Sequence, residues 1–196
     1  MLELAPAEKA TLLRLACASI EDALGIAGAL DAALRDAALT PALEQARGAF
    51  VTLRQKEVLD SAGHPRLRGC IGTLEADEPL YRNVIHNAAR AALDDPRFPP
   101  LQAGELAGLS LEISALTPLA LADGPGGIVP GRDGVSLRKG THRSVFLPQV
   151  ATEQGWDTRQ LLEHLARKAG LPADGWQGAE LRTFQAEVFG EDERKA

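Results

Sequence analysis

The chain has 196 residues, of which 45% are hydrophobic and 24% are charged, and these values indicate a globular protein rather than a disordered one. The formal net charge of −6 argues against attraction of the whole surface to nucleic acid or to anionic lipid. The two cysteines, Cys17 and Cys70, do not form a CxxC pair, which excludes a disulfide framework and leads us to expect a reduced, cytoplasmic protein.

Hydrophobic periodicity predicts helices and strands in alternating groups along the chain. Pro6 is suited to the first turn of a helix. Asp157 is suited to an N-cap, with the Gln160 side chain reaching back to the cap in a variant of the capping box. Strands are indicated by β-branched residues or by alternating apolar residues. In chain order we expect helices at residues 6–24 and, more weakly, 29–39, strands at 48–54 and 67–73, a helix at 77–94, strands at 109–116, 134–138 and 144–147, a helix at 157–169 and a strand at 180–189.

This order of elements lacks the regular alternation of strand and helix that a doubly wound parallel sheet requires. We therefore expect an α+β fold with a mixed, largely antiparallel sheet flanked by helices. The strands at 48–54 and 67–73 are expected to form an antiparallel pair, because turn-forming residues at 60–65 lie in the loop between them. Within a single domain of residues 1–196, we expect residues 1–47 to form an N-terminal helical segment and residues 48–189 to form the α+β body.

The segment Leu67–Thr73, with the sequence LRGCIGT, is the first candidate site. Residues two apart share a face of a strand, so Arg68 and Cys70 are expected to lie together. A nearby guanidinium lowers the pKa of a thiol, and Gly69 and Gly72 leave the backbone open to a ligand or to another chain segment. From spacing alone, a small buried cysteine in a tightly packed sheet is the commoner arrangement, and a reactive Cys70 is the alternative.

The segment DPRFPP places Asp95 and Arg97 on either side of a proline, so a charged pair is held on a rigid, non-helical backbone. Two interpretations stay open. The segment is either a preorganised binding loop, or a connector in which Phe98 fills part of the core and Arg97 makes a structural ion pair.

Other polar groups have ordinary structural interpretations. Cys17 falls among the apolar residues of the first predicted helix, and we assign it to the core. Four polar side chains share one side of the helix at 77–94, which we interpret as its solvated face: Asn83, His86, Asn87 and Arg90. Four basic side chains surround Gly140, which we interpret as a solvated hairpin tip: Arg138, Lys139, His142 and Arg143.

Common cofactor, metal and membrane signatures are missing from the sequence. It contains no GxGxxG turn, no GxxxxGK[ST] loop, no GxSxG elbow and no HxH, HxxxH or HExxH pair. It also contains no leader-like basic and apolar segment and no apolar run long enough to cross a bilayer. We therefore expect no cofactor, no metal, no nucleic acid and no membrane among its partners, whereas a small-molecule substrate stays open.

From about Gly48 to Phe189, the sequence resembles the AMMECR domain family, because five motifs occur in the expected order. The motifs are GAFVTL at 48–53, LRGCIGT at 67–73, DPRFPPL at 95–101, LPQVA at 147–151 and EQGWD at 153–157. The family is named for a human chromosomal region linked to Alport syndrome with midface hypoplasia and elliptocytosis. Its bacterial and archaeal members include the A component of the AmmeMemoRadiSam system.

The resemblance implies a two-lobed α+β domain with a cleft between the lobes and the Arg-Gly-Cys segment near that cleft. It also implies a set of residues that line the cleft: Arg68, Gly69, Cys70, Asp95, Arg97 and Gln149. It suggests two partners, a Memo-type protein and a radical SAM enzyme. The chain cannot itself be the radical component, because it lacks the CxxxCxxC ligands of the cluster.

The family has no established activity, so two expectations about function stand side by side. In the first, the chain is an enzyme or a substrate-presenting subunit in which Cys70 is the nucleophile or covalent carrier. Arg68 and Arg97 would then hold an anionic group, and Asp95 would orient Arg97 or relay a proton. In the second, the chain is a non-catalytic binding or scaffold module.

Overall fold

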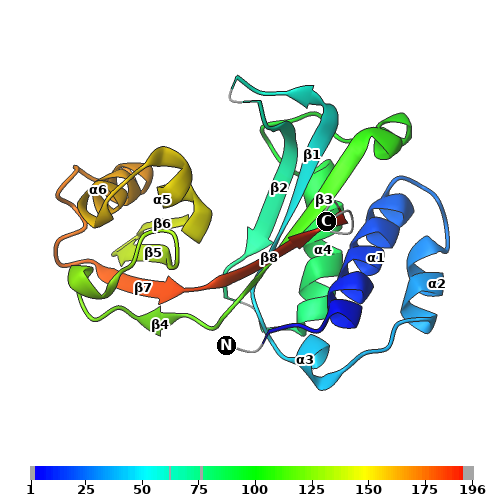
Figure 1. The fold of residues 1–196 in the computed structure, drawn as a ribbon, viewed down its shortest axis with the longest axis horizontal. Coiled ribbons are helices and arrows are strands. Elements are labelled where there is room, and N and C mark those ends of the chain that lie inside the picture. The colour runs from blue at the N-terminus through cyan, green and yellow to red at the C-terminus, as the bar shows by residue number, and fades with distance from the viewer. Residues whose placement is uncertain (1–2, 62, 76, 192–196) are drawn as a thin grey trace. The chain divides into compact units, whose positions relative to one another are not determined.

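The structure is a computed structural model that describes residues 3–61, 63–75 and 77–191 (Figure 1). The helices are α1 (Pro6–Ala23), α2 (Ala29–Arg35), α3 (Pro41–Glu44), α4 (Leu80–Leu93), α5 (Pro148–Gln154) and α6 (Thr158–Lys168), with the 3-10 helices η1 (Ala103–Gly108) and η2 (Pro125–Gly127). The strands are β1 (Ala49–Leu59), β2 (Pro65–Thr73), β3 (Leu109–Leu116), β4 (Ala120–Leu121), β5 (Gly134–Lys139), β6 (His142–Phe146), β7 (Glu180–Phe184) and β8 (Ala186–Gly190).

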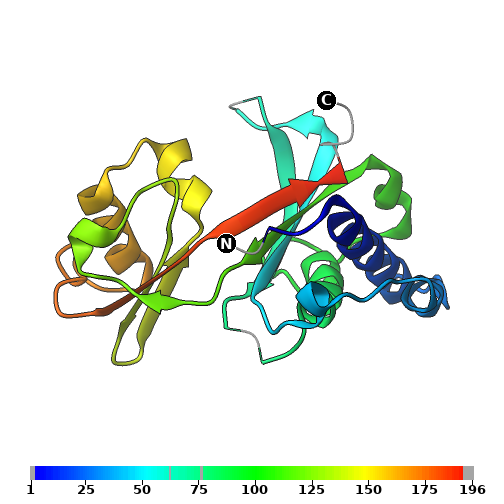
Figure 2. The same cartoon turned by 60° about the horizontal axis from the view of Figure 1, so that its bottom comes forward.

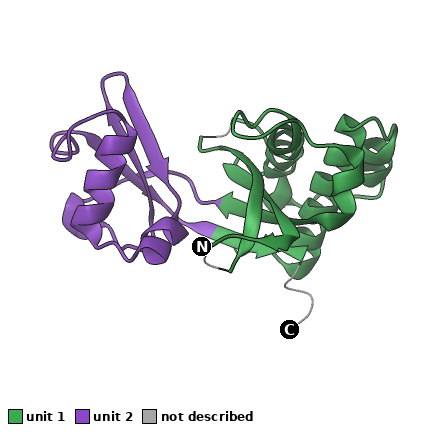
Figure 3. Cartoon of the chain, turned by 90° about the horizontal axis from the view of Figure 1, so that it is seen from above, with its two compact units in different colours: residues 1–115, 187–196 green, residues 116–186 purple. Residues whose placement is uncertain are grey.

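The chain forms two compact units, which Figure 3 shows in different colours. Unit 1 comprises residues 1–115 and 187–196, and unit 2 comprises residues 116–186. One four-stranded sheet has the order β2-β1-β3-β8, and the other has the order β4-β7-β5-β6. The expected α+β class is therefore confirmed, with two sheets in place of the single sheet that we predicted. Among the described residues, no helix has both the length and the hydrophobicity needed to span a bilayer.

In unit 1, α1 and α4 cover one face of the sheet (Figure 1, Figure 2). Leu12 of α1 and Val84 of α4 pack with Val51, Leu53 and Ile113 of the sheet in one buried cluster. Strand β1 pairs antiparallel with β2, which confirms the expected pairing of the strands at 48–54 and 67–73. It also pairs antiparallel with β3 on its other side. The face of the sheet that carries Val51 and Leu53 thus belongs to the core, and the alternate residues lie on the other face.

The polar side of α4 is only partly solvated, which corrects the interpretation of its four polar residues. Asn83 and Asn87 are 0% and 1% exposed. Their side-chain amides donate to the carbonyl oxygens of Arg47 at 2.9 Å and of Ala49 at 3.2 Å. These carbonyl groups lie at the start of β1. The asparagine side chains supply the hydrogen-bond donors that buried carbonyl groups need at this position. The other two residues of the stripe, His86 and Arg90, are exposed as expected.

In unit 2, β5 pairs antiparallel with β6 and β7, and α6 contributes the apolar side chains that bury this sheet. The predicted cap of α6 is confirmed. The Asp157 carboxylate accepts the backbone N–H of Gln160 at 2.8 Å, and the Gln160 side chain accepts the N–H of Asp157 at 3.1 Å. The basic side chains around Gly140 are exposed at the β5–β6 turn, so the hairpin-tip interpretation is also confirmed.

The predicted strand at residues 180–189 is wrong as a single element. Strand β7 ends at Phe184 in one sheet and β8 begins at Ala186 in the other. At the change of sheet, Gln185 exchanges two hydrogen bonds with Thr117, both of 2.9 Å. Phe189 is 1% exposed and Val188 is 37% exposed, so the Phe189 side chain of β8 faces the core and Val188 lies on the more open face. The sequence reasoning also missed α5 and the short strand β4.

Candidate functional site

Cys70 lies on β2, the edge strand of its sheet, directly opposite Thr52 of β1. The side chain of Cys70 is half-buried. The hydroxyl of Thr52 donates to the sulfur, with 3.4 Å between Oγ1 and Sγ. The backbone N–H and carbonyl of Cys70 bind partners outside the sheet, so Thr52 and Cys70 form a non-hydrogen-bonded pair, in which opposite side chains approach most closely.

Asp95 and Arg97 close the open edge of β2 at Cys70. Oδ2 of Asp95 accepts the backbone N–H of Cys70 at 2.9 Å. Nη2 of Arg97 donates to the carbonyl oxygen of Cys70 at 3.3 Å. The two side chains therefore make the bonds that a further strand would make at this position. We call Asp95, Arg97 and the backbone of Cys70 the edge clamp.

The two charged side chains of the edge clamp also bind each other in a bidentate pair. Nε of Arg97 lies 2.9 Å from Oδ1 of Asp95, and Nη2 lies 2.7 Å from Oδ2. The backbone N–H of Arg97 donates to Oδ1 as well, at 3.1 Å. The side chain of Asp95 is 3% exposed, whereas that of Arg97 is 54% exposed. A buried carboxylate thus fixes a guanidinium whose other side reaches solvent.

Each member of this pair stabilises the charged form of the other. Hydrogen bonds from the Arg97 side chain hold the pKa of Asp95 well below its usual range, with further lowering by the backbone N–H of Cys70 and of Arg97, against the opposing effect of burial. The same hydrogen bonds raise the pKa of Arg97 against the opposing effect of burial, and the charge of Asp95 raises it further. Asp95 is therefore an anion, and a poor proton acceptor, at neutral pH.

Arg68 does not bind at Cys70, although we expected the two side chains to lie together. The register passes from the pair Leu53–Gly69 to the pair Arg54–Leu67, so Arg68 is the extra residue of a β-bulge. The bulge breaks the two-residue alternation on which the expectation rested. The Arg68 guanidinium is instead bound by Glu105 of η1, at 2.8 Å from Nε and 3.0 Å from Nη2. This pairing lowers the pKa of Glu105.

Gly69 and Gly72 permit close packing on opposite faces of β2. A Cβ atom on Gly69 would lie 2.1 Å from the backbone oxygen of Ala91, so β2 and α4 could not pack as they do. A Cβ atom on Gly72 would lie 2.1 Å from the ring of Phe50. Gly72 and Cys70 share a face, so the Phe50 ring lies on the same side of the sheet as the sulfur.

The sixth predicted residue, Gln149, is the second residue of α5 in unit 2 and is half-buried. The predicted set is therefore divided between the two units. In unit 1 the structure brings Cys70, Asp95 and Arg97 together, whereas Arg68 binds η1 and Gly69 faces α4. The cleft implied by the resemblance stays a prediction.

Sequence reasoning missed three residues that pack against or bind the segment LRGCIGT. Thr52 and Phe50 lie in the first motif, and the predicted antiparallel pairing of the two motifs is the signal that could have placed them opposite the glycine-cysteine segment. No pattern in the sequence pointed to Glu105, because its ion pair with Arg68 depends on the path of η1. Within the described part of the chain, no group of three or more His, Cys, Asp or Glu side chains is arranged to hold a metal ion.

Comparison with known proteins agrees with the motifs. The AMMECR1 family model matches residues 13–189. A protein of Pyrococcus furiosus is 41% identical over 161 residues, which is 79% of this chain and 75% of the relative. A protein of Methanothermobacter thermautotrophicus is 41% identical over 193 residues, which is 94% of this chain and 95% of the relative.

A solved structure has a similar fold. The crystal structure of uncharacterized protein PH0010 from Pyrococcus horikoshii superimposes with a TM-score of 0.79 at 36% sequence identity, covering 92% of this chain and 90% of that one. The family model, the archaeal relatives and this fold agree with the five motifs found in the sequence. The chain belongs to the AMMECR1 family.

Proposed function

We propose that the chain acts through Cys70 on a small anionic molecule, as a cysteine-dependent enzyme or as a substrate-presenting subunit. The edge clamp carries this proposal, because it fixes a half-exposed guanidinium next to the backbone of Cys70. A cation that is already held in place loses little conformational freedom when it binds an anion. The Thr52 hydroxyl adds a hydrogen-bond donor at the sulfur itself.

Each residue has a distinct role in this proposal. The sulfur of Cys70 would add to an electrophilic carbon, for example a carbonyl or a conjugated double bond. A sulfur–carbon bond would form, the π bond would break, and the thiol proton would end on the atom that receives the electron pair. Arg97 would hold the anionic group of the substrate, and Asp95 would position Arg97 rather than relay a proton, since it is strongly held as an anion.

We further propose that the chain works with a Memo-type protein and a radical SAM enzyme. The support is the resemblance to a family whose bacterial and archaeal members include the A component of such a system. The sequence offers no CxxxCxxC cluster ligands of its own, so any radical step would belong to the partner. In this arrangement Cys70 would present a bound substrate to the partner.

A non-catalytic binding or scaffold module is the second candidate, and one observation favours it. The charged residues of the motifs at 67–73 and 95–101 have structural partners, since Arg68 binds Glu105 and Asp95 binds Arg97 and the Cys70 backbone. On this account the motifs build the edge of β2, and the sulfur has no chemical role. The two candidates differ in whether Cys70 reacts while the protein is folded.

Alkylation of the folded protein separates the two candidates. The intact chain is treated with iodoacetamide at several pH values, and labelling of the Cys70 peptide is followed by mass spectrometry. The proposal predicts that Cys70 is labelled without unfolding, and that the isosteric variant Thr52→Val slows this labelling because the sulfur loses its hydrogen-bond donor. Labelling only at the rate of global unfolding would exclude a reactive Cys70 and favour the scaffold role.

A further inference from the structure

An aromatic ring lies beside Cys70 on the face of the sheet that is turned away from α4. Phe50 of β1 pairs with Gly72 of β2, and its ring takes the place that a Cβ atom of Gly72 would need, so the ring leans from β1 across β2. Phe50 and Cys70 are thus diagonal neighbours, roughly 7–8 Å apart, which is within reach of an aromatic side chain. All three residues are half-buried, so part of the ring is accessible next to the thiol.

Two hydrogen-bond donors meet at the open edge of β2. The N–H and carbonyl of Cys70 point away from β1, since they bind Asp95 and Arg97. Gly72 lies two residues further along the strand, so its N–H points to the same edge. The other donor is Nη1 of Arg97, because Nε and Nη2 make the contacts of the edge clamp. Within residues 3–61, 63–75 and 77–191, neither donor is bound to a protein acceptor.

We propose that the site at Cys70 takes a flat carboxylic acid, whose electrophilic carbon lies between the carboxylate and an aromatic or similarly flat apolar group. This inference rests on the proposed function and names the substrate class of the same site. One carboxylate oxygen would accept from Nη1 of Arg97 and the other from the N–H of Gly72. The flat group would lie against the ring of Phe50, in the offset or edge-to-face arrangement that aromatic pairs prefer.

The positions of other carboxylates direct the anion to this edge. Asp95 occupies the side of the guanidinium formed by Nε and Nη2, and Nη1 is turned away from it. Glu112 of β3 pairs with Thr52 on the same sheet face, roughly 10 Å from Cys70 across two strand spacings. An anion placed over β3 would meet this carboxylate, whereas at the edge of β2 it meets two donors.

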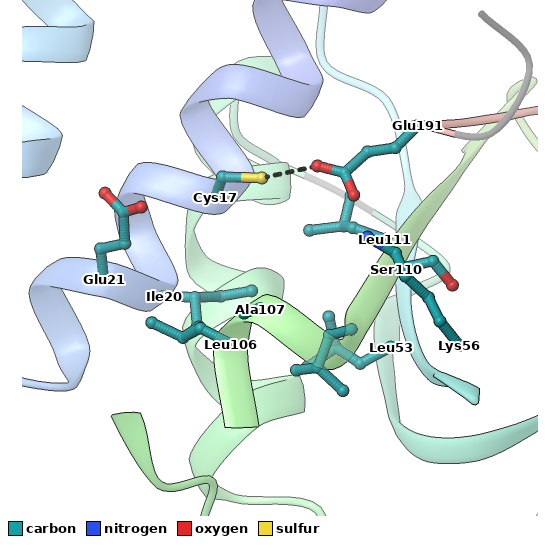
Figure 4. Close-up of a pocket in the computed structure, with 11 residues that line it drawn as sticks. Cys17, Ile20, Glu21, Leu53, Lys56, Leu106, Ala107, Ser110, Leu111 and Glu191 are labelled. Carbon is teal, nitrogen blue, oxygen red and sulfur yellow. Dashed lines mark hydrogen bonds between the residues drawn. The ribbon is translucent and has the colours of Figure 1, made fainter. Parts of the chain in front are cut away.

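The second cysteine provides an internal comparison. Cys17 of α1 is half-buried and lines a cavity of about 240 Å³ that shares no residue with the site at Cys70 (Figure 4). Its assignment to the core is therefore corrected to a position on a cavity wall. The Cys17 thiol donates to the Glu191 carboxylate, with 3.4 Å between Sγ and Oε1. A carboxylate at the sulfur should disfavour anionic reagents, which is the opposite of the preference expected at Cys70.

Four matched reagents test the proposal on the intact chain. 3-Benzoylacrylate and 3-acetylacrylate differ in a phenyl and a methyl group, and each is compared with its neutral amide. In each reaction a sulfur–carbon bond forms next to the carboxylate or amide, the carbon–carbon π bond breaks, and the thiol proton ends on the carbon next to the ketone. Labelling rates of Cys70 and Cys17 are measured by mass spectrometry and divided by the rates with free N-acetylcysteine.

We expect the phenyl reagents to label Cys70 about two- to tenfold faster than the methyl reagents after this correction, as an aromatic contact would give. The anions should exceed the amides by about two- to fivefold at Cys70 and not at Cys17. Phe50→Leu should remove the phenyl preference and keep the anion preference. Tyr81→Leu is the matched control and should keep both, because Tyr81 is a half-buried aromatic residue of α4, on the other face of the sheet.

The possible failures are distinguishable. Equal corrected rates of the phenyl and methyl reagents at Cys70 in the wild type would overturn this inference, whereas a remaining preference for the anions would leave the proposed function standing. A full phenyl preference in Phe50→Leu would overturn the role of the ring. No labelling of Cys70 by any reagent before unfolding would overturn the proposed function and this inference with it. The wild-type comparison needs no variant that must fold.

Discussion

The carboxylate of Asp95 accepts the backbone N–H of Cys70 at 2.9 Å, although the two residues are 25 positions apart in the chain. Because β2 is an edge strand, the outward N–H and carbonyl of Cys70 have no strand beside them. The carboxylate binds the first group, and the guanidinium of Arg97 binds the second. The same contacts that complete the sheet edge therefore fix a cation next to the cysteine.

Replacement of Asp95 by asparagine should destabilise the protein. The amide cannot accept all the hydrogen bonds that the carboxylate accepts, and Arg97 loses its counter-charge. We expect a loss of about 2 kcal/mol in the free energy of unfolding, below the loss for a fully buried pair because Arg97 is half-exposed. Urea unfolding measures this change. The control is Asp94→Asn, an exposed neighbour, and an equal effect of the two variants would contradict this role of Asp95.

The stabilisation by Asp95 should also depend on pH. The pKa of Asp95 is lowered in the folded protein by its hydrogen bonds with Arg97, so folding favours the ionised form. The stabilisation is therefore complete above the unfolded pKa of about 4, and it is lost progressively as the pH falls from there toward the low folded pKa. We expect the difference in unfolding free energy between the wild type and Asp95→Asn to shrink below about pH 4. A difference that is constant from pH 7 to pH 3 would contradict the pairing.

Gly69 should not tolerate a side chain, because the backbone oxygen of Ala91 occupies the position of its Cβ atom. A backbone group inside a helix cannot move aside as a side chain can. We expect Gly69→Ala to cost about 3 kcal/mol of unfolding free energy, at the upper end of ordinary overpacking. Gly104→Ala is the matched control, since nothing lies within 4 Å of its added Cβ atom. Similar midpoints of thermal unfolding for the two variants would mean that β2 and α4 are farther apart than described.

Arg68 and Arg97 should have separable roles. Arg68→Gln removes the bidentate contact with Glu105, and we expect it to lower the free energy of unfolding by about 1 kcal/mol because Glu105 is partly exposed. The rate at which iodoacetamide labels Cys70 in the folded protein should stay close to that of the wild type. A large change in labelling, without a matching change in stability, would show that Arg68 acts on the sulfur after all.

The local patterns of the sequence predicted much of the fold. The pairing of the strands at 48–54 and 67–73 and the cap of α6 at Asp157 depend on residues close in the chain, and both are confirmed. The pattern of residues 180–189 does not show that this segment forms two strands. Apolar residues alternate on both sides of Gln185, and nothing in their spacing indicates that the two halves join different sheets. The burial of Asn83 depends on the carbonyl of Arg47, which helical periodicity does not show.

The candidate site was predicted in part. The resemblance implied one set of residues that includes Cys70, Asp95 and Arg97, and the structure brings these three together. The position of Arg68 could not be predicted, because a one-residue bulge reverses the alternation and only the register of β1 with β2 reveals it.

The most direct test of the central claim compares two reagents that differ in charge. Iodoacetate and iodoacetamide label Cys70 in the folded protein, and the ratio of their rates measures the preference for an anion. If Arg97 holds anions beside Cys70, Arg97→Gln should lower this ratio by about two- to fivefold, the effect expected of a half-exposed charge, whereas Arg66→Gln, on an exposed residue of the same strand, should not. An unchanged ratio in Arg97→Gln would contradict the claim that the edge clamp prepares Cys70 for an anionic substrate.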